Sequence, residues 1–237
     1  MYKNLYINGC SFTAGNKLPE NEIWPYLLSK KLNLKLINHS INGNSMQSIA
    51  YHSVNYLSTL DSKETLVVIG LTWPTRYMVS LLDSQVNVTP ATFGREEVLL
   101  SGNRRLHPYS IENLDKYHQD DYRANLDVII KFADYYKAQL KNNSEELYNN
   151  QLLNQYTQIV YLQSFLKANK FKYNFIDFGS FNKHPQLEYN SNLPIFKSID
   201  KSKIIKLEDN KYNHGPTSHP TAEHCREISD IIFNVVK

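Results

Sequence analysis

The chain has 237 residues, of which 41% are hydrophobic and 12% aromatic, so it carries enough apolar side chains to build a packed core and is not expected to be disordered. Its formal net charge is +3, from 26 basic and 23 acidic side chains that are interspersed, and the absence of a basic stripe argues against nucleic acid as a partner. No apolar stretch approaches the length of a membrane span, and no signal peptide precedes the first predicted strand. We therefore expect a cytoplasmic protein, or one carried in a larger assembly, with residues 1–237 forming a single domain.

Strands and helices alternate along the first third of the chain. Short apolar runs predict strands at 3–7 and 34–37, and helical spacing of apolar residues predicts helices at 22–32 and 46–60. The run TLVVIGL at 65–71 is almost entirely apolar, which is typical of a strand buried on both faces. This order predicts an α/β protein with a three-layer, doubly wound, flavodoxin-like and mostly parallel sheet.

The alternation stops after residue 76. Residues 77–118 contain mixed short apolar pieces, and we expect a partly helical insertion there, beside the site. Two helical stripes of apolar residues then predict long helices within 120–140 and around 153–166. The remaining predicted elements are strands at 173–178 and 203–207 and a closing helix at 221–236.

A polar octet, NGCSFTAG, leaves the first predicted strand at residues 8–15. Parallel sheets bind ligands outside the carboxyl ends of their strands, so Ser11 on this turn is a candidate nucleophile. The same residues also suit an ordinary turn. The neighbouring Cys10 thiol is the other candidate, but successive residues leaving a strand face opposite sides, and we expect Ser11 to face the site.

Three further polar segments follow in a fixed order, INGNS at 41–45, GLTWPTR at 70–76 and SHP at 218–220. With the first, they resemble the SGNH, or GDSL-type, hydrolase family, whose blocks carry in order a nucleophilic Ser, an oxyanion Gly, an oxyanion Asn and a His. The resemblance spans nearly the whole chain and matches Ser11, Gly43 and His219 to the first, second and last blocks. Thr72 stands where the family has Asn.

The resemblance implies acyl transfer through a serine. His219 would take the proton of the Ser11 hydroxyl as general base. The backbone N–H groups of Ser11 and Gly43 would bind the developing oxyanion, and the Thr72 side chain would replace the Asn donor. Trp73 and Arg76 leave the same strand end and are candidates for binding a sugar face and an acidic group of the substrate. Equally, Trp73 could be buried under the insertion, with the arginine on a structural carboxylate.

The family usually has an Asp shortly before the His, where this chain has Pro216 and Thr217. The N–H of the imidazole must then bond a backbone carbonyl of its own loop, the Thr217 hydroxyl, or a distant carboxylate such as Asp177 or Asp209. We predict a neutral partner, so that the serine and histidine form a dyad. No cofactor or metal is expected, because the neighbouring histidines, His214 and His224, lack the i, i+4 spacing and nearby donors of a metal site.

Two classes of function are consistent with these features. The first is a serine-dependent hydrolase of small or carbohydrate-linked carboxylic esters, of the deacylase or acetylesterase type. The alternative is a catalytically weakened SGNH-like protein that binds a glycan or a protein partner. A third possibility, an anion binder that uses the first turn for phosphate, fits less well because this turn lacks the glycine density and lysine of a P-loop.

Overall fold

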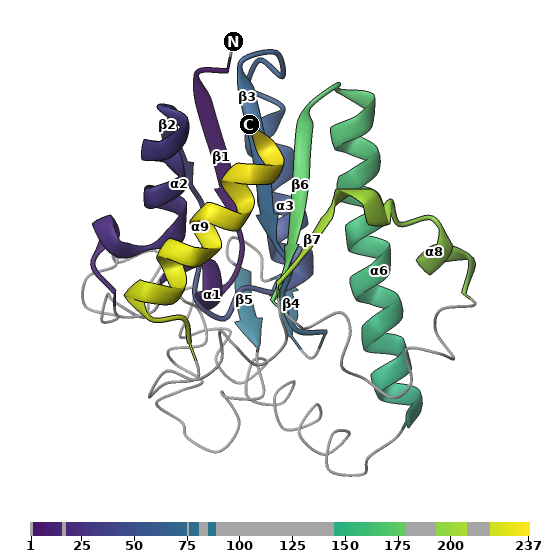
Figure 1. Cartoon of the computed structure of the whole chain (residues 1–237). Coiled ribbons are helices and arrows are strands. Elements are labelled where there is room, and N and C mark those ends of the chain that lie inside the picture. The colour runs from purple at the N-terminus through teal and green to yellow at the C-terminus, as the bar shows by residue number, and fades with distance from the viewer. Residues whose placement is uncertain are drawn as a thin grey trace, which may run out of the picture.

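The computed structural model describes residues 2–15, 18–74, 76–80, 85–88, 145–178, 193–207 and 219–237. Within these ranges a five-stranded sheet has the order β2-β1-β3-β6-β7, and every neighbouring pair is parallel (Figure 1). The strands are β1 (Asn4–Asn8), β2 (Lys35–Asn38), β3 (Thr65–Gly70), β6 (Lys172–Asp177) and β7 (Ile204–Lys206). The predicted α/β fold with a parallel sheet is confirmed.

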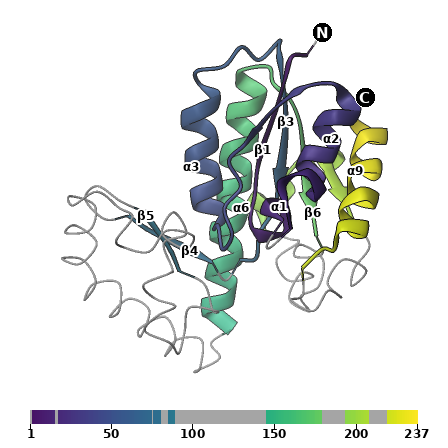
Figure 2. The ribbon, with the colours of Figure 1, turned by 90° about the vertical axis from the view of Figure 1, so that its left-hand side faces the viewer.

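Helices cover both faces of the sheet. Figure 2 shows α2 (Trp24–Leu32) and α9 (Ala222–Val236) on one face and α3 (Met46–Leu57) and α6 (Glu145–Ala168) on the other. Alternate strand residues enter the two resulting cores: Leu5 and Ile7 of β1 pack with α2 and α9, whereas Tyr6 packs with α3 and α6. The three predicted layers are therefore present.

The central strand, β3, explains why the sheet is covered on both sides. All six of its residues are buried, and Val67 and Ile69 enter one core while Leu66 and Val68 enter the other. A strand of this composition loses apolar burial if either face stays open to water. The burial of this strand on both faces, expected from its unbroken apolar run, is confirmed.

Several predicted boundaries differ from the observed ones. The helix predicted at 22–32 begins as a 3-10 turn, η1 (Glu20–Glu22), and continues as α2 with Pro25 in its first turn. A short helix, α1 (Ser11–Ala14), follows β1 where only a turn was expected, because four residues are too few to show helical periodicity.

The predicted insertion begins with strands rather than helices. Strands β4 (Tyr77–Ser80) and β5 (Gln85–Val88) form an antiparallel pair that lies beyond the carboxyl edge of the sheet in Figures 1 and 2. The rest of the insertion, and the helix predicted within 120–140, lie outside the described residues. No helix within the described ranges is long and apolar enough for a bilayer crossing.

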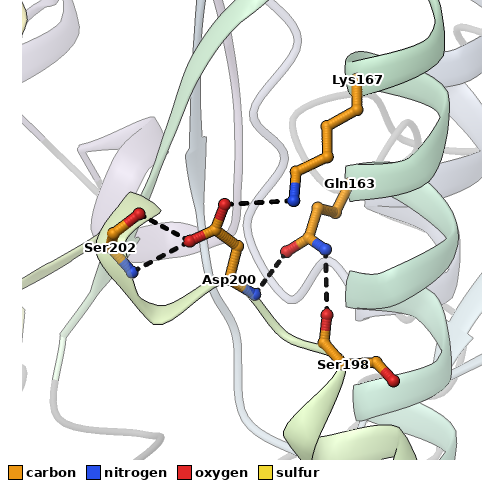
Figure 3. Close-up of polar contacts among 5 residues, drawn as sticks. All are labelled: Gln163, Lys167, Ser198, Asp200 and Ser202. Carbon is orange, nitrogen blue, oxygen red and sulfur yellow. Dashed lines mark hydrogen bonds and ion pairs between the residues drawn. The ribbon is translucent and has the colours of Figure 1, made fainter.

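A polar cluster fastens the segment before β7 to α6 (Figure 3). This segment contains α8 (Pro194–Lys197) and η4 (Lys201–Lys203). Gln163 accepts a hydrogen bond from the Asp200 N–H at 2.7 Å and donates to the Ser198 carbonyl at 3.1 Å. The Asp200 carboxylate accepts from the Ser202 hydroxyl at 2.6 Å and lies 3.1 Å from the Lys167 ammonium. These bonds lower the pKa of Asp200, chiefly through Ser202 and then Lys167.

Candidate active site at the carboxyl edge of the sheet

Ser11 begins α1, directly after the turn that leaves β1. Its side chain is nearly buried, with 3% of the residue exposed. Helix α1 is fixed by the Trp24 indole, which donates to the Phe12 carbonyl at 3.1 Å, and it ends at Gly15, whose φ of 79° is the left-handed value that favours glycine. Cys10 is a free cysteine that packs in the core beneath α2 and α9.

The loop that carries Gly43 is hydrogen-bonded to the serine turn. The Ile41 N–H donates to the Gly9 carbonyl at 3.1 Å, and the Asn44 side chain donates to the same carbonyl at 3.2 Å. Gly43 lies between these two residues, is buried and has a φ of 74°, a conformation that residues with a Cβ adopt at a cost. The first and second sequence blocks therefore meet at one edge of the sheet.

Two backbone N–H groups at this edge have no acceptor in the described part of the chain. They belong to Ser11 and Gly43, and neither donates a hydrogen bond to another described residue. Ser11 owes this to its position in the first turn of α1, where helix N–H groups have no intrahelical acceptor. Both are backbone groups, so they carry no side-chain rotamer freedom, which suits an oxyanion hole.

Asn8, at the end of β1, is a fully buried residue whose role the sequence did not indicate. Its amide oxygen accepts from the Gly9 N–H at 2.8 Å, and its amide nitrogen donates to the Ser53 hydroxyl at 3.1 Å and the Ile49 carbonyl at 3.3 Å, both on α3. Tyr6 belongs to the same cluster, and burial raises the pKa of its phenol to about 12. The available signal was a polar residue directly after the apolar run of residues 5–7.

Thr72 connects the third block to the second. Its hydroxyl donates to the Asn44 carbonyl at 2.9 Å and accepts from Nη1 of Arg76, also at 2.9 Å. The Gln155 amide of α6 donates to the Thr72 carbonyl, a contact that the sequence did not indicate. A hydroxyl has one proton, and here it is directed at Asn44. The role of Thr72 as a side-chain oxyanion donor stays a prediction.

The ends of β1 and β3 lie against α1 because both carry glycine. A Cβ added to Gly9 or to Gly70 would lie 2.3 Å from the Thr13 hydroxyl oxygen, far inside contact distance. Thr13 is fully buried, and its hydroxyl has no hydrogen-bond partner among the described residues. The two glycines therefore set how closely the serine helix approaches the sheet.

His219 lies just before α9, which begins with a capping box: the Thr221 hydroxyl accepts from the His224 N–H, and His224 Nδ1 accepts from the Thr221 N–H. The ring centroid of His219 is 5.1 Å from that of Phe12, the residue after Ser11. Within the described residues no hydrogen bond joins Ser11 and His219. Catalytic contacts are often long in ligand-free structures and close in the complex.

The remaining predicted residues divide into three groups. Trp73 and Arg76 are partly exposed after β3. Asp177 is fully buried at the end of β6, the same edge of the sheet. The other residues named from the sequence lie outside the described residues. They are Pro216 and Thr217, which stand at the family's usual acid position, and also Asp209, His214 and Ser218.

No protein-family model and no curated protein matches the sequence. Solved structures do match. The psychrotrophic esterase EstA from Pseudoalteromonas sp. shares 14% identity and a TM-score of 0.51, covering 98% of this chain and 95% of its own. The acetyl xylan esterase AlAXEase shares 12% identity and a TM-score of 0.47, covering 99% and 100%.

A member of the lipolytic protein G-D-S-L family from Veillonella parvula DSM 2008 shares 14% identity and a TM-score of 0.39, covering 98% and 97%. At these identities a structural match establishes the fold. The sheet order, the three layers and the match with EstA over nearly the whole of both chains agree with the four sequence blocks. The α/β fold that the resemblance to the SGNH, or GDSL-type, hydrolases implies is therefore confirmed.

Proposed function

We propose that this protein is a serine-dependent ester hydrolase in which Ser11 is the nucleophile and His219 the general base. The observation that carries the proposal is the pair of hydrogen bonds from Ile41 and Asn44 to the Gly9 carbonyl, which hold the Gly43 loop against the serine turn. They support an arrangement in which a nucleophile and two open N–H donors face one substrate carbonyl.

The proposed reaction has two halves. His219 takes the hydroxyl proton of Ser11 as the oxygen attacks the ester carbonyl, and the N–H groups of Ser11 and Gly43 bind the negative oxygen. The imidazolium then gives the proton to the leaving alcohol, which leaves an acyl-serine. Water, deprotonated by the same imidazole, releases the acid and restores the enzyme. No metal or cofactor enters this sequence.

The proposed substrates are small or carbohydrate-linked esters, with acetyl as the preferred acyl group. The site is proposed to exclude long acyl chains, and Trp73 is proposed to contact a sugar face. A series of 4-nitrophenyl esters from acetyl to octanoyl tests this part. We expect kcat/KM to fall steeply with chain length, whereas a flat or rising series would indicate an open apolar groove.

The hydrogen bond of the Thr72 hydroxyl supports the second candidate function, a catalytically weakened SGNH-like protein that binds a glycan or a protein without turning it over. The Thr72 hydroxyl donates its proton to the Asn44 carbonyl. To act as a third oxyanion donor, it would have to break this hydrogen bond and donate to the substrate instead. Loss of one such donor typically costs about 2.7 to 4 kcal/mol of transition-state stabilisation. Turnover of 4-nitrophenyl acetate by the wild type, absent in Ser11→Ala and kept in Cys10→Ala, decides between the two functions.

A further inference from the structure

We infer that Arg76 binds a carboxylate or phosphate of the substrate, a group that is already negatively charged before the ester reacts. This inference rests on the proposed hydrolase function and names its substrate class, esters that carry an anionic group. The guanidinium of Arg76 has two hydrogen-bond partners among the described residues. Its Nη1 donates to the Thr72 hydroxyl at 2.9 Å and to the Asn44 carbonyl at 3.5 Å. Both acceptors are uncharged, so neither neutralises the cation.

Among the described residues, no carboxylate pairs with Arg76. Three lysines do form ion pairs in that part of the chain, and each lies on an exposed surface. Lys3 pairs with Glu64, Lys31 with Asp230 and Lys167 with Asp200. Arg76 instead is partly buried beside the Gly43 loop. A cation without a counter-charge at a ligand-binding edge favours an anion brought by the ligand.

The unused hydrogen-bond donors have the shape of a carboxylate site. A guanidinium has five N–H groups, and both hydrogen bonds of Arg76 within the described residues are made by Nη1. The Nε–H and the Nη2–H on its side edge remain, and these two are parallel. They match the two oxygens of a carboxylate or phosphate in a bidentate contact.

The contacts on Nη1 also fix the orientation of that free edge. Thr72 follows β3 directly, and its hydroxyl and carbonyl are held by Asn44 and by Gln155 of α6. Thr72 is thus a positioning residue for Arg76. The Asn44 carbonyl belongs to the residue after Gly43, so the guanidinium lies next to the loop proposed to bind the ester oxygen. We therefore assign the anion and the ester to one substrate.

Two pairs of esters test the inference. In 4-acetoxybenzoate and its methyl ester the negative charge is on the alcohol part, and in 4-nitrophenyl hydrogen glutarate and 4-nitrophenyl pentanoate it is on the acyl part. We expect the wild type to prefer one charged ester over its neutral partner by about tenfold to a hundredfold in kcat/KM, the range of a charge-assisted hydrogen bond. Added salt should reduce this ratio, because the group is partly exposed.

Variants at Arg76 and one control show where the preference arises. In Arg76→Gln the ratio should fall to about one, and in Arg76→Lys it should be intermediate, because the charge stays but the parallel pair of N–H groups is lost. Thr72→Val should also lower the ratio while leaving the charge in place. Lys63→Gln removes the same charge from the exposed turn before β3, at the opposite edge of the sheet, and should keep the wild-type ratio.

Three results would overturn the inference: no preference for either charged ester, a preference that survives Arg76→Gln, or an equal fall on charged and neutral esters, which would make Arg76 an oxyanion donor instead. Binding gives a readout without turnover. Calorimetric titration of Ser11→Ala should give tighter binding of the preferred charged ester than of its neutral partner, and adding Arg76→Gln should remove the difference. If the wild type turns over neutral esters through Ser11 but shows no charge preference, the hydrolase proposal stands and this inference fails.

Discussion

The amide nitrogen of Asn44 lies 3.2 Å from the carbonyl oxygen of Gly9 and donates to it. This bond joins the loop proposed to supply an oxyanion donor to the turn that presents the proposed nucleophile. The same side chain also lies 3.4 Å from the Asn8 amide oxygen, so both strand-end residues are held by one amide.

We predict that Asn44→Ala lowers kcat by at least about tenfold with a smaller change in KM, because a loosened Gly43 N–H stabilises the transition state less. Unfolding in urea should show a loss of about 1 to 3 kcal/mol, the cost of a broken buried hydrogen bond. Asn55→Ala, an exposed position of α3, is the matched control and should change neither quantity appreciably. Wild-type kcat in a folded Asn44→Ala protein would show that this bond does not position the loop.

The contact of Gly70 and Gly9 with Thr13 gives a second prediction. Gly70→Ala should destabilise the protein by about 1 to 3 kcal/mol through overpacking, because its new Cβ would lie 2.3 Å from the Thr13 hydroxyl oxygen. Adding Thr13→Ala removes that oxygen, and the next contacts, at 3.3 Å and 3.5 Å, are tolerable, so most of the loss should be recovered. Denaturant unfolding of the two single variants and the double variant measures this.

Gly9→Ala should behave differently in the same experiment. Its new Cβ would also lie 2.8 Å from the Thr13 Cβ, an atom that Thr13→Ala keeps. Recovery should therefore be poor for Gly9→Ala and good for Gly70→Ala. Equal recovery at both positions would show that the serine helix adjusts its distance from the sheet freely.

The sequence predicted most of the fold for reasons that are local. The apolar run of β3 and the helical spacing in α2 and α3 are properties of neighbouring residues, and the alternation of strands and helices then favours a parallel sheet. The short helix α1 and the antiparallel pair of β4 and β5 were missed because these elements have only four residues each, too few to show a clear period. Helix ends differed by a few residues because they depend on caps and tertiary contacts.

The candidate site was less accessible from the sequence. Parallel strands end at one edge of a sheet, so the segments of Ser11, Gly43 and Thr72 could be expected there together. The hydrogen bonds of Asn8, Asn44 and Thr72 could not, because each joins side chains to backbone groups brought close only by tertiary packing. The bond from the Thr72 hydroxyl to the Asn44 carbonyl is one example, and the role of this hydroxyl toward a substrate stays a prediction.

A third prediction concerns pH and the Asp200 cluster. The pKa of Asp200 is lowered in the folded protein, so its carboxylate stabilises the fold above its ordinary pKa of 3.8, and this contribution is lost as the pH falls through the lowered folded value. Asp200→Asn should therefore lower the unfolding midpoint at neutral pH, and its difference from the wild type should shrink at acidic pH. Asp230→Asn, which removes the carboxylate of an exposed ion pair with Lys31, should have little effect. A pH-independent difference for Asp200→Asn would contradict the assignment.

The proposed dyad predicts the pH dependence of turnover. With a neutral partner for His219, kcat/KM should rise with pH to a plateau, because the base must be unprotonated to accept the Ser11 proton. Asp177→Asn and Asp209→Asn should keep this profile and most of the rate. Asp177 is the critical case, since it is fully buried at the edge of the sheet that carries the site. A thousandfold fall in either variant, with the fold intact by circular dichroism, would reveal a displaced acid and a triad.

The most direct test of the central claim is covalent labelling with a fluorophosphonate probe, followed by peptide mass spectrometry. A serine activated by a base displaces fluoride from phosphorus and keeps the phosphonyl group, whereas an ordinary serine does not. We expect one adduct, on Ser11, formed at a similar rate in Cys10→Ala, absent in Ser11→Ala and much slower in His219→Ala. No adduct on Ser11 in the folded wild-type protein, or an adduct that forms as fast without His219, would contradict the account.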